Sequence, residues 1–172
     1  MIVNIPFDLG YGLTEYVEFL GYSLCQRGKE WHLDGPDTVG EAQAIIDSYN
    51  PWPIEKAKKI DEINNAFMHA VSELVSGTTE FERNSWVIQE SEAITYSQDS
   101  NSSCPSLTVL ANSRGIPLES LVVKVLAKSN LYKQNYFMLQ GKRDKIEDFI
   151  KTFPDNGSIE RLIDLQSIEF GN

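Results

Sequence analysis

Apolar residues recur at helical spacing over most of the chain after residue 53. The longest regular pattern starts at Leu118 and steps by four and three residues as far as Ile150, which is the a/d spacing of a helix seam. We therefore predict one nearly continuous helix over residues 117–150, with Pro117 at its start. The ten seam positions are Leu118, Val122, Val125, Ser129, Tyr132, Tyr136, Leu139, Arg143, Ile146 and Ile150.

Two earlier segments have the same kind of periodicity. Between residues 54 and 75 the apolar positions step by three and four, and Gly77 ends the pattern. These positions are Ile60, Ile63, Phe67, Ala70 and Leu74. Residues 80–97 place Trp86, Gln89 and Ala93 on one face of a second helix. A helix of 34 residues is about 50 Å long and needs partners for its seam. These partners are either the two earlier helices, folded back in antiparallel fashion, or copies of the long helix from other subunits.

Two shorter helices complete the predicted helical part. Pro105 opens a short helix that Gly115 closes, and Ser103 lies where an N-cap residue is expected. The segment 158–168 has the apolar spacing of a last, C-terminal helix.

The first 50 residues have a mixed pattern. A short apolar run over residues 1–5 precedes a helical pattern over 13–20, and two strand-like segments then flank the turn around Gly28. Residues 39–46 predict a further short helix. Pro51-Trp52-Pro53 interrupts any helix at that point. The fold class is therefore α+β, with a small mixed α/β unit over residues 1–50 and a helical hairpin or coiled-coil-like domain over residues 53–172.

Composition and charge narrow the function classes. Asp and Glu number 25 against 15 Lys and Arg, which gives a net charge of −10. This negative net charge argues against a protein whose whole surface binds nucleic acid or anionic lipid. We expect no contact with a membrane, because no stretch approaches the length and hydropathy of a membrane helix. Cys25 and Cys104 form no C-x-x-C motif, and we expect a cytosolic setting with free thiols.

Motifs for catalysis or cofactor binding are missing from the sequence. Gly10 and Gly12 lack the remaining residues of a phosphate-binding loop. Glu30, His32 and Asp34 alternate along one strand without a fourth metal ligand, and we expect them to face solvent. No nucleophile has an activating motif beside it. We therefore expect no enzyme activity, no metal and no cofactor.

One segment is basic although the whole chain is acidic. Residues 105–145 contain seven basic residues against two acidic ones: Arg114, Lys124, Lys128, Lys133, Lys142, Arg143 and Lys145 against Glu119 and Asp144. Two helices joined at Gly115 also have the spacing of a helix-turn-helix reader, so a nucleic-acid-binding regulator is the alternative function. The first turns of the long helix weigh against it, because they carry Leu121 and Val122 where polar, base-reading groups are needed.

The segment from Ser85 to Asp148 carries a set of residues with a characteristic order. They are Trp86, Gln89, Glu92, Ala93, Pro105, Leu107, Ala111, Arg114, Gly115, Leu121, Lys128, Gly141, Lys142, Arg143, Glu147 and Asp148. In these residues the sequence resembles a family of phage and prophage tail-fibre-associated proteins. The resemblance implies a non-enzymatic tail-fibre assembly or baseplate accessory protein. It further implies tail-fibre or baseplate proteins as partners, and a place in the virion tail or in the host cytoplasm during assembly.

The candidate interaction residues lie in this part of the chain. They are Trp86, Arg114, Tyr132, Tyr136, Phe137 and Arg143. The three aromatic residues of the long helix exceed what one short partner helix can cover, so we expect an oligomeric or fibre contact there. Ser129 and Arg143 are polar residues in the seam that can fix its register or the oligomeric state. Arg143 should meet a carboxylate, from Glu92, from Glu147 of another copy, or from a partner chain.

Overall fold

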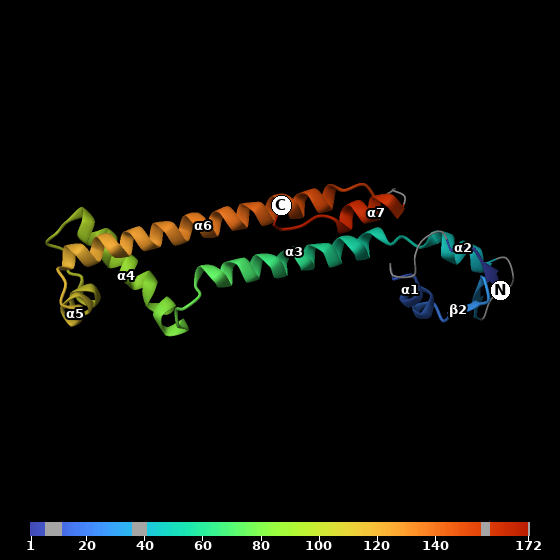
Figure 1. Ribbon diagram of the computed structural model, residues 1–172, viewed down its shortest axis with the longest axis horizontal. Helices are drawn as coiled ribbons and strands as arrows, with labels where there is room; N and C mark the ends of the chain where they lie inside the picture. Colours follow the sequence, from blue (N-terminus) through green and yellow to red (C-terminus); the bar gives the residue numbers. More distant parts are fainter. Residues whose placement is uncertain (6–11, 36–40, 156–158, 172) are drawn as a thin grey trace. The chain divides into compact units, whose positions relative to one another are not determined.

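The computed structural model describes residues 1–5, 12–35, 41–155 and 159–171. Within these ranges it contains a small antiparallel sheet near the N-terminus and helices over most of the rest, which confirms the α+β class (Figure 1). Contacts between residues divide the chain into two compact units. Unit 1 consists of Met1–Asn64 together with Ile146–Asn172, and unit 2 is Asn65–Lys145.

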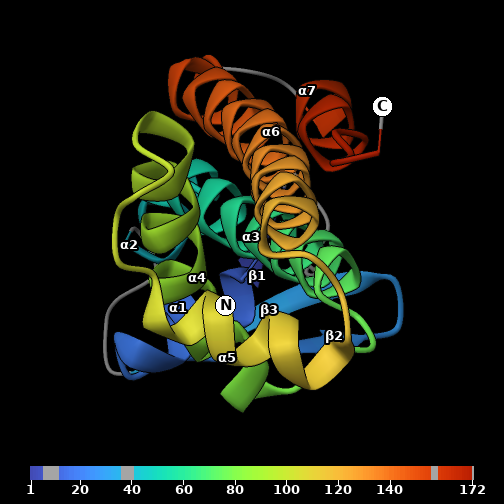
Figure 2. The ribbon, with the colours of Figure 1, turned by 90° about the vertical axis from the view of Figure 1, so that its left-hand side faces the viewer.

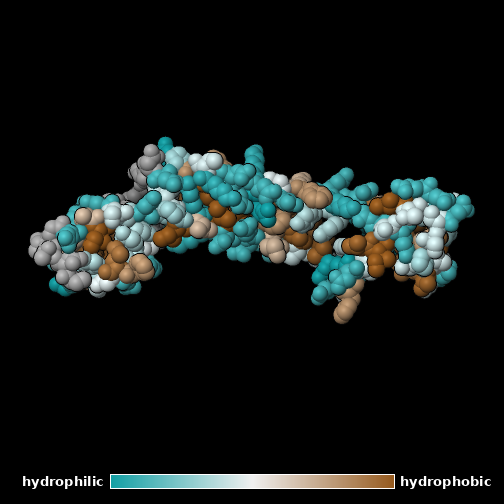
Figure 3. Space-filling view, turned by 180° about the vertical axis from the view of Figure 1, so that it is seen from behind, coloured by the Kyte–Doolittle hydropathy of each residue, from teal (hydrophilic) through white to brown (hydrophobic). Residues whose placement is uncertain are grey.

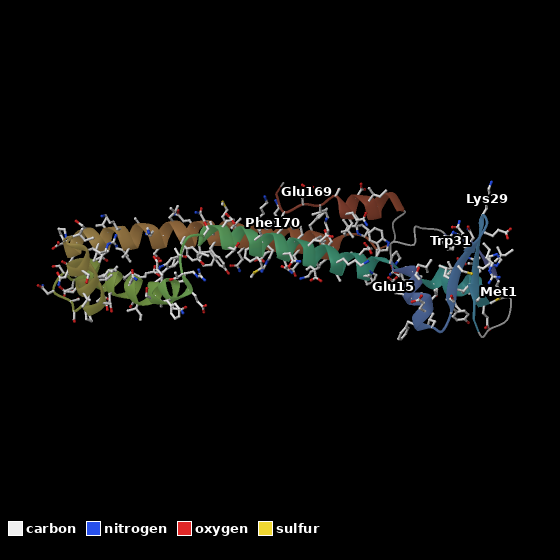
Figure 4. The ribbon with its side chains drawn as sticks, turned by 60° about the horizontal axis from the view of Figure 1, so that its bottom comes forward. Met1, Glu15, Lys29, Trp31, Glu169 and Phe170 are labelled. Atoms are coloured by element: carbon white, nitrogen blue, oxygen red, sulfur yellow. The ribbon has the colours of Figure 1, made fainter. Side chains whose placement is uncertain are left out.

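The sheet of unit 1 has three strands in the order β1-β3-β2. Strands β1 (Ile2–Val3) and β2 (Ser23–Arg27) both pair with β3 (Glu30–Asp34) in antiparallel fashion. Gly28 and Lys29 form the two-residue turn of the β2-β3 hairpin, and Gly28 has a φ of 68°. A positive φ at the first turn position is typical of a type II′ turn, which glycine adopts without steric cost. Figure 4 shows Lys29 at the tip of this hairpin.

Two short helices complete this part of unit 1. Helix α1 (Leu13–Phe19) and helix α2 (Glu41–Ser48) contribute to the same apolar cluster as the sheet. The fully buried side chains at its centre are Leu13, Val17, Leu33 and Ile46. Val39, the predicted start of the second helix, lies outside the described residues. The predicted mixed unit thus has its own apolar core.

Helix α3 (Trp52–Leu74) begins within the Pro51-Trp52-Pro53 boundary. The Asn50 side-chain oxygen accepts a hydrogen bond from the backbone N–H of Trp52 at 3.1 Å. Pro53 stands in the first turn, where its missing N–H costs nothing. Pro51 and Asn50 therefore fix the start of α3, and the seam residues Ile63 and Phe67 are buried as predicted.

Four further helices follow. They are α4 (Glu80–Gln98), α5 (Pro105–Arg114), α6 (Leu118–Thr152) and α7 (Ile159–Gln166). The predicted long helix is confirmed: α6 runs without a break through Gly141, and its ten seam positions are all buried or half-buried. Ser158, the predicted start of the last helix, lies outside the described residues.

An apolar cluster packs α3, α6 and α7 together in the helical part of unit 1. Trp52, Ile63, Ile150 and Leu165 are buried in it, and the rings of Trp52 and Phe153 are 5.7 Å apart. This cluster fixes the C-terminal helix against residues that come about a hundred positions earlier.

Two lysines of α3 bind the ends of the later helices. Lys56 donates hydrogen bonds to the carbonyl oxygens of Lys151 and Phe153 and pairs with Asp155. Lys59 donates to the carbonyl oxygen of Gln166 at 2.6 Å. Carbonyl groups at helix C-termini have no partner within their own helix, and cations are favourable there. The two lysines therefore cap α6 and α7.

Unit 2 has a separate apolar cluster between α4, α5 and the first turns of α6. Its buried residues are Ala93, Cys104, Leu107, Ala111, Leu121 and Val122. Figure 2 shows α5 beside α4 in this unit. Gly115 ends α5 with a φ of 63°, in the left-handed conformation that is common at helix C-termini. Because this turn is short, α5 packs against the start of α6.

Candidate interaction site

The six residues predicted for interaction all lie in unit 2. Trp86 is in α4, Arg114 ends α5, and Tyr132, Tyr136, Phe137 and Arg143 are in α6. The structure brings Trp86, Tyr132 and Tyr136 together. The ring of Phe137 lies edge-on to Tyr136 at 5.5 Å but is largely exposed, and Arg114 is exposed at the end of α5.

The aromatic residues of the seam contact partners within the chain. Trp86 meets Tyr132 edge-on with ring centroids 5.7 Å apart, and Tyr136 lies 6.2 Å from Phe67 of α3. Tyr132 and Tyr136 stack at 6.1 Å. These rings therefore hold α3 and α4 against α6, while the side chain of Phe137 stays 62% exposed. The spacing of apolar residues predicts Phe67 in a helix seam but does not indicate that it belongs to this aromatic group.

Arg143 meets a carboxylate, but not one of those expected. Its Nε and Nη2 atoms donate to Oδ1 of Asp144, the next residue, at 3.0 and 2.6 Å. Its guanidinium carbon lies 4.9 Å from the centre of the Phe67 ring, a cation–π distance. The expected partners are engaged elsewhere within the chain: Glu92 binds α5, and Glu147 pairs with Lys151 at 2.6 Å.

Ser129, the other polar residue of the seam, fixes the register of α4 on α6. Its hydroxyl donates to Oε1 of Glu90, which also accepts from the ammonium group of Lys133. The hydrogen bonds from Lys133 and Ser129 hold the pKa of Glu90 below its usual value. A carboxylate that binds two residues one turn apart prevents the helices from sliding along each other.

Helix α5 is capped by a residue that the sequence analysis did not identify. Cys104 is its N-cap residue and has no side-chain cap bond, so the expectation of a Ser103 cap is wrong. The carboxylate of Glu92 instead accepts from the backbone N–H groups of Ser106 and Leu107, at 3.2 and 2.9 Å. Burial raises the pKa of Glu92, but these hydrogen bonds outweigh it and leave the pKa below its usual value.

A groove opens between α4 and α5. Its volume is about 580 Å³, and its lining residues are Ser85, Ile88, Gln89, Pro105, Ser106, Val109, Leu110 and Ser113. The two walls are stripes at helical spacing, one from each helix. The Glu92 cap and the packing of Ala93 on Leu107 fix these walls.

Exposed apolar residues gather around this groove. Figure 3 shows hydrophobic surface over the part of the molecule that contains α4 and α5. Ile88 and Val109, which line the groove, are 55% and 66% exposed. Phe81, which is 89% exposed, lies outside its lining, one turn before Ser85 on α4. Phe81 and Ile88 were not predicted as interaction residues, because they lie outside the seam face of α4. Their signal was present, since Phe81 and Ile88 are large apolar residues outside the seam pattern.

The outward side of α6 has a second apolar stripe, with lysines beside it. Leu131 and Met138 are 59% and 66% exposed and stand seven residues apart, on one helix face. Lys124, Lys128 and Lys145 are exposed on the same helix. Other basic residues of the segment make contacts within the chain: Lys133 pairs with Glu90, and Arg143 pairs with Asp144.

The alternating residues of β3 make local polar contacts. His32 lies 3.8 Å from Glu30 and is half-buried, which corrects the expectation that it faces solvent. Asp34 binds Arg27 at 2.5 Å and accepts a weak hydrogen bond from Cys25. Trp31, which lies between Glu30 and His32 on β3, packs against the apolar cluster of unit 1 (Figure 4). Within the described ranges, no three His, Cys, Asp or Glu side chains are arranged to hold a metal ion.

Both cysteines, Cys25 and Cys104, are free thiols. In the part of the chain that the structure covers, none of the helices combines the length and hydropathy needed to span a membrane.

Comparisons with models of protein families, with curated proteins and with solved structures found no significant match to this chain.

Proposed function

We propose that the chain is a phage tail structural or assembly protein that binds a tail-fibre or baseplate protein through the exposed side of α6. The tail role rests on the resemblance over residues 85–148. That segment contains most of α4, all of α5 and most of α6. The observation that supports binding is the exposed apolar stripe of α6, with Phe137 next to Met138.

The chemistry of this surface favours a protein partner. Exposed apolar side chains with charged residues around them are typical of binding surfaces, where the apolar centre is buried and the charges select the partner. Lys124, Lys128 and Lys145 favour a partner with acidic residues at the edge of its contact.

The alternative, a nucleic-acid-binding regulator, has less support. Leu121 and Val122 are buried against α4 and α5 and are not available to read bases. Lys133 and Arg143, two of the seven basic residues of the segment, bind carboxylates of the same chain. A phosphate-binding surface needs such cations free for counterion release.

The test is co-sedimentation of the purified chain with the fibre or baseplate proteins encoded beside it. The variant Phe137→Ser with Met138→Ser removes exposed apolar groups and should abolish co-sedimentation while the thermal unfolding midpoint stays the same. Phe19→Ser is the matched control, because Phe19 is 88% exposed and lies in α1, outside this surface. If the chain does not co-sediment with these proteins but shifts the electrophoretic mobility of DNA in a salt-dependent way, the regulator is favoured instead.

A further inference from the structure

The outward side of α6 carries a second seam, which we call the outer seam. It steps by four and three residues from Ser120 to Lys145, and all of its positions are exposed. These positions are Ser120, Lys124, Ala127, Leu131, Gln134, Met138, Gly141 and Lys145. We propose that the outer seam binds one α-helix of a partner protein, with apolar residues at heptad spacing and carboxylates beside them. This inference rests on the proposed function and states the form of the partner at that site.

The middle of the outer seam differs from an ordinary solvent-facing side of a helix. Between Lys124 and Lys145 it carries one polar side chain, that of Gln134. Leu131 and Met138 are both more than half exposed. Helices of soluble proteins place polar residues on the side that faces water. The apolar outer seam therefore indicates a contact that the isolated chain does not make.

Gly141 indicates that the partner comes close to α6. Glycine inside a helix is destabilising relative to alanine, and the close approach of another backbone is one reason for its use. Among the described residues no such neighbour exists, because a Cβ atom at position 141 has nothing within 4 Å. A second helix on the outer seam supplies the neighbour. Its backbone approaches at Ala127 and Gly141, and Leu131 and Met138 between them fill its grooves.

The lysines on this side of α6 favour carboxylates in the partner. Lys124, Lys128 and Lys145 are exposed, and in the described ranges none of them pairs with an Asp or Glu side chain. Lys124 and Lys128 are one turn apart, where like charges destabilise a helix. Carboxylates beside the apolar residues of a partner helix neutralise these charges, as in other coiled coils. A second copy of the outer seam has the wrong charge, because it brings the same lysines.

The spacing and length of the outer seam fit a helix better than an extended segment. Side chains of a strand return to the same face every second residue and cannot follow steps of four and three. Lys124 and Lys145 are three heptads apart, which is about 32 Å along α6. A partner helix of ordinary length therefore covers the whole apolar part between the two lysines.

Carbodiimide cross-linking of the complex with the co-sedimenting fibre or baseplate protein tests this form of the partner. The reagent joins a lysine to a carboxylate that lies against it, and mass spectrometry identifies both residues. Lys124 and Lys145 should each link to an Asp or Glu of the partner, and these two carboxylates should lie about 21 residues apart in one helix. Lys29, an exposed lysine at the tip of the β2-β3 hairpin, should give no link to the partner.

A substitution at Gly141 tests the close approach. Gly141→Leu places a large side chain where the two backbones meet, and it should lower the affinity for the partner roughly tenfold or more. The thermal unfolding midpoint should not fall, because leucine is the better helix former. Asn84→Leu is the matched control, since it adds the same side chain at an exposed position of α4. It should bind like the original chain.

The outcomes separate this inference from the proposed function. A chain that co-sediments with none of the fibre or baseplate proteins overturns both. If the chain co-sediments but Gly141→Leu keeps the original affinity, the partner helix is excluded and the proposed function stands. The same holds if the linked carboxylates lie in separate segments of the partner, if they belong to a second copy of this chain, or if Lys124 and Lys145 link to none.

Discussion

Glu92 and Leu107 join two helices through a cap that comes from outside the capped helix. Oε2 of Glu92, in the fourth turn of α4, accepts the backbone N–H of Leu107 at 2.9 Å, while Oε1 accepts that of Ser106. Both donors belong to the first turn of α5, where N–H groups have no partner in their own helix. A carboxylate at this place is also favoured by the helix dipole.

Glu92→Gln should lower the free energy of unfolding by an amount that depends on pH. The folded-state pKa of Glu92 lies below its unfolded value of about 4.3, so the carboxylate stabilises the fold above that pH. This stabilisation is lost as the pH falls through the lower, folded-state pKa. We expect a loss of about 1 kcal/mol at pH 7, as for other helix caps, and a smaller difference near pH 3, measured by urea unfolding.

Asp61→Asn is the control for that measurement, because Asp61 is an exposed carboxylate in the middle of α3. It should leave stability nearly unchanged at both pH values. An equal effect of Glu92→Gln at pH 7 and pH 3 would contradict the charged cap.

Two leucines of α6 should differ sharply in their effect on stability. Leu121 is 1% exposed in the cluster of unit 2, and Leu131 is 59% exposed on the outward side. Leu121→Ala should cost about 2–5 kcal/mol through lost burial and a residual cavity. Leu131→Ala should change stability by less than about 0.5 kcal/mol. Equal effects in denaturant unfolding would show that α6 packs by a different face.

Two glycines should respond to alanine with opposite signs. Gly115 has a φ of 63° at the end of α5, so Gly115→Ala forces a strained backbone and should destabilise by about 1 kcal/mol. Gly141 lies inside α6 with open space around it. Gly141→Ala should stabilise by about 0.5–1 kcal/mol, because alanine is the better helix former. Thermal unfolding of both variants checks the signs.

Lys59→Met should weaken the attachment of α7 to α3. The substitution keeps the apolar stem of Lys59, which is only 9% exposed, but removes its bond to the carbonyl oxygen of Gln166. We expect a loss of about 1–3 kcal/mol and faster cleavage within residues 159–171 under native proteolysis. Lys145→Met, at an exposed position of α6, should not change the cleavage rate.

The helices were largely predictable because their signals are local. The spacing of Leu118, Val122 and Val125 defines a seam whatever its partner is, and Pro117 and Gly115 mark the ends of neighbouring helices. The hairpin at Gly28 was predictable for the same reason, because a two-residue turn depends on its own backbone.

The side-chain partners were not predictable, because they depend on how the helices lie beside one another. Nothing near Glu92 in the sequence indicates that it caps a helix that starts at Pro105. The sequence predicts a carboxylate partner for Arg143, but it does not indicate that this partner is Asp144. The contact of Arg143 with the Phe67 ring depends on the packing of α3 on α6. The groove shares this property, since its two walls come from different helices.

Unit 1 is discontinuous in sequence, and this determines when it can form. Its helical cluster needs both Trp52 and Leu165, whereas the buried residues of the cluster in unit 2 all lie between Ala93 and Val122. Contacts between distant residues pay a larger loop-closure cost and form later. During synthesis the cluster of unit 2 can therefore form before Ile150 and Leu165, the later members of the cluster that buries Trp52 and Ile63, have left the ribosome. Apolar side chains that stay exposed in that interval raise the risk of aggregation.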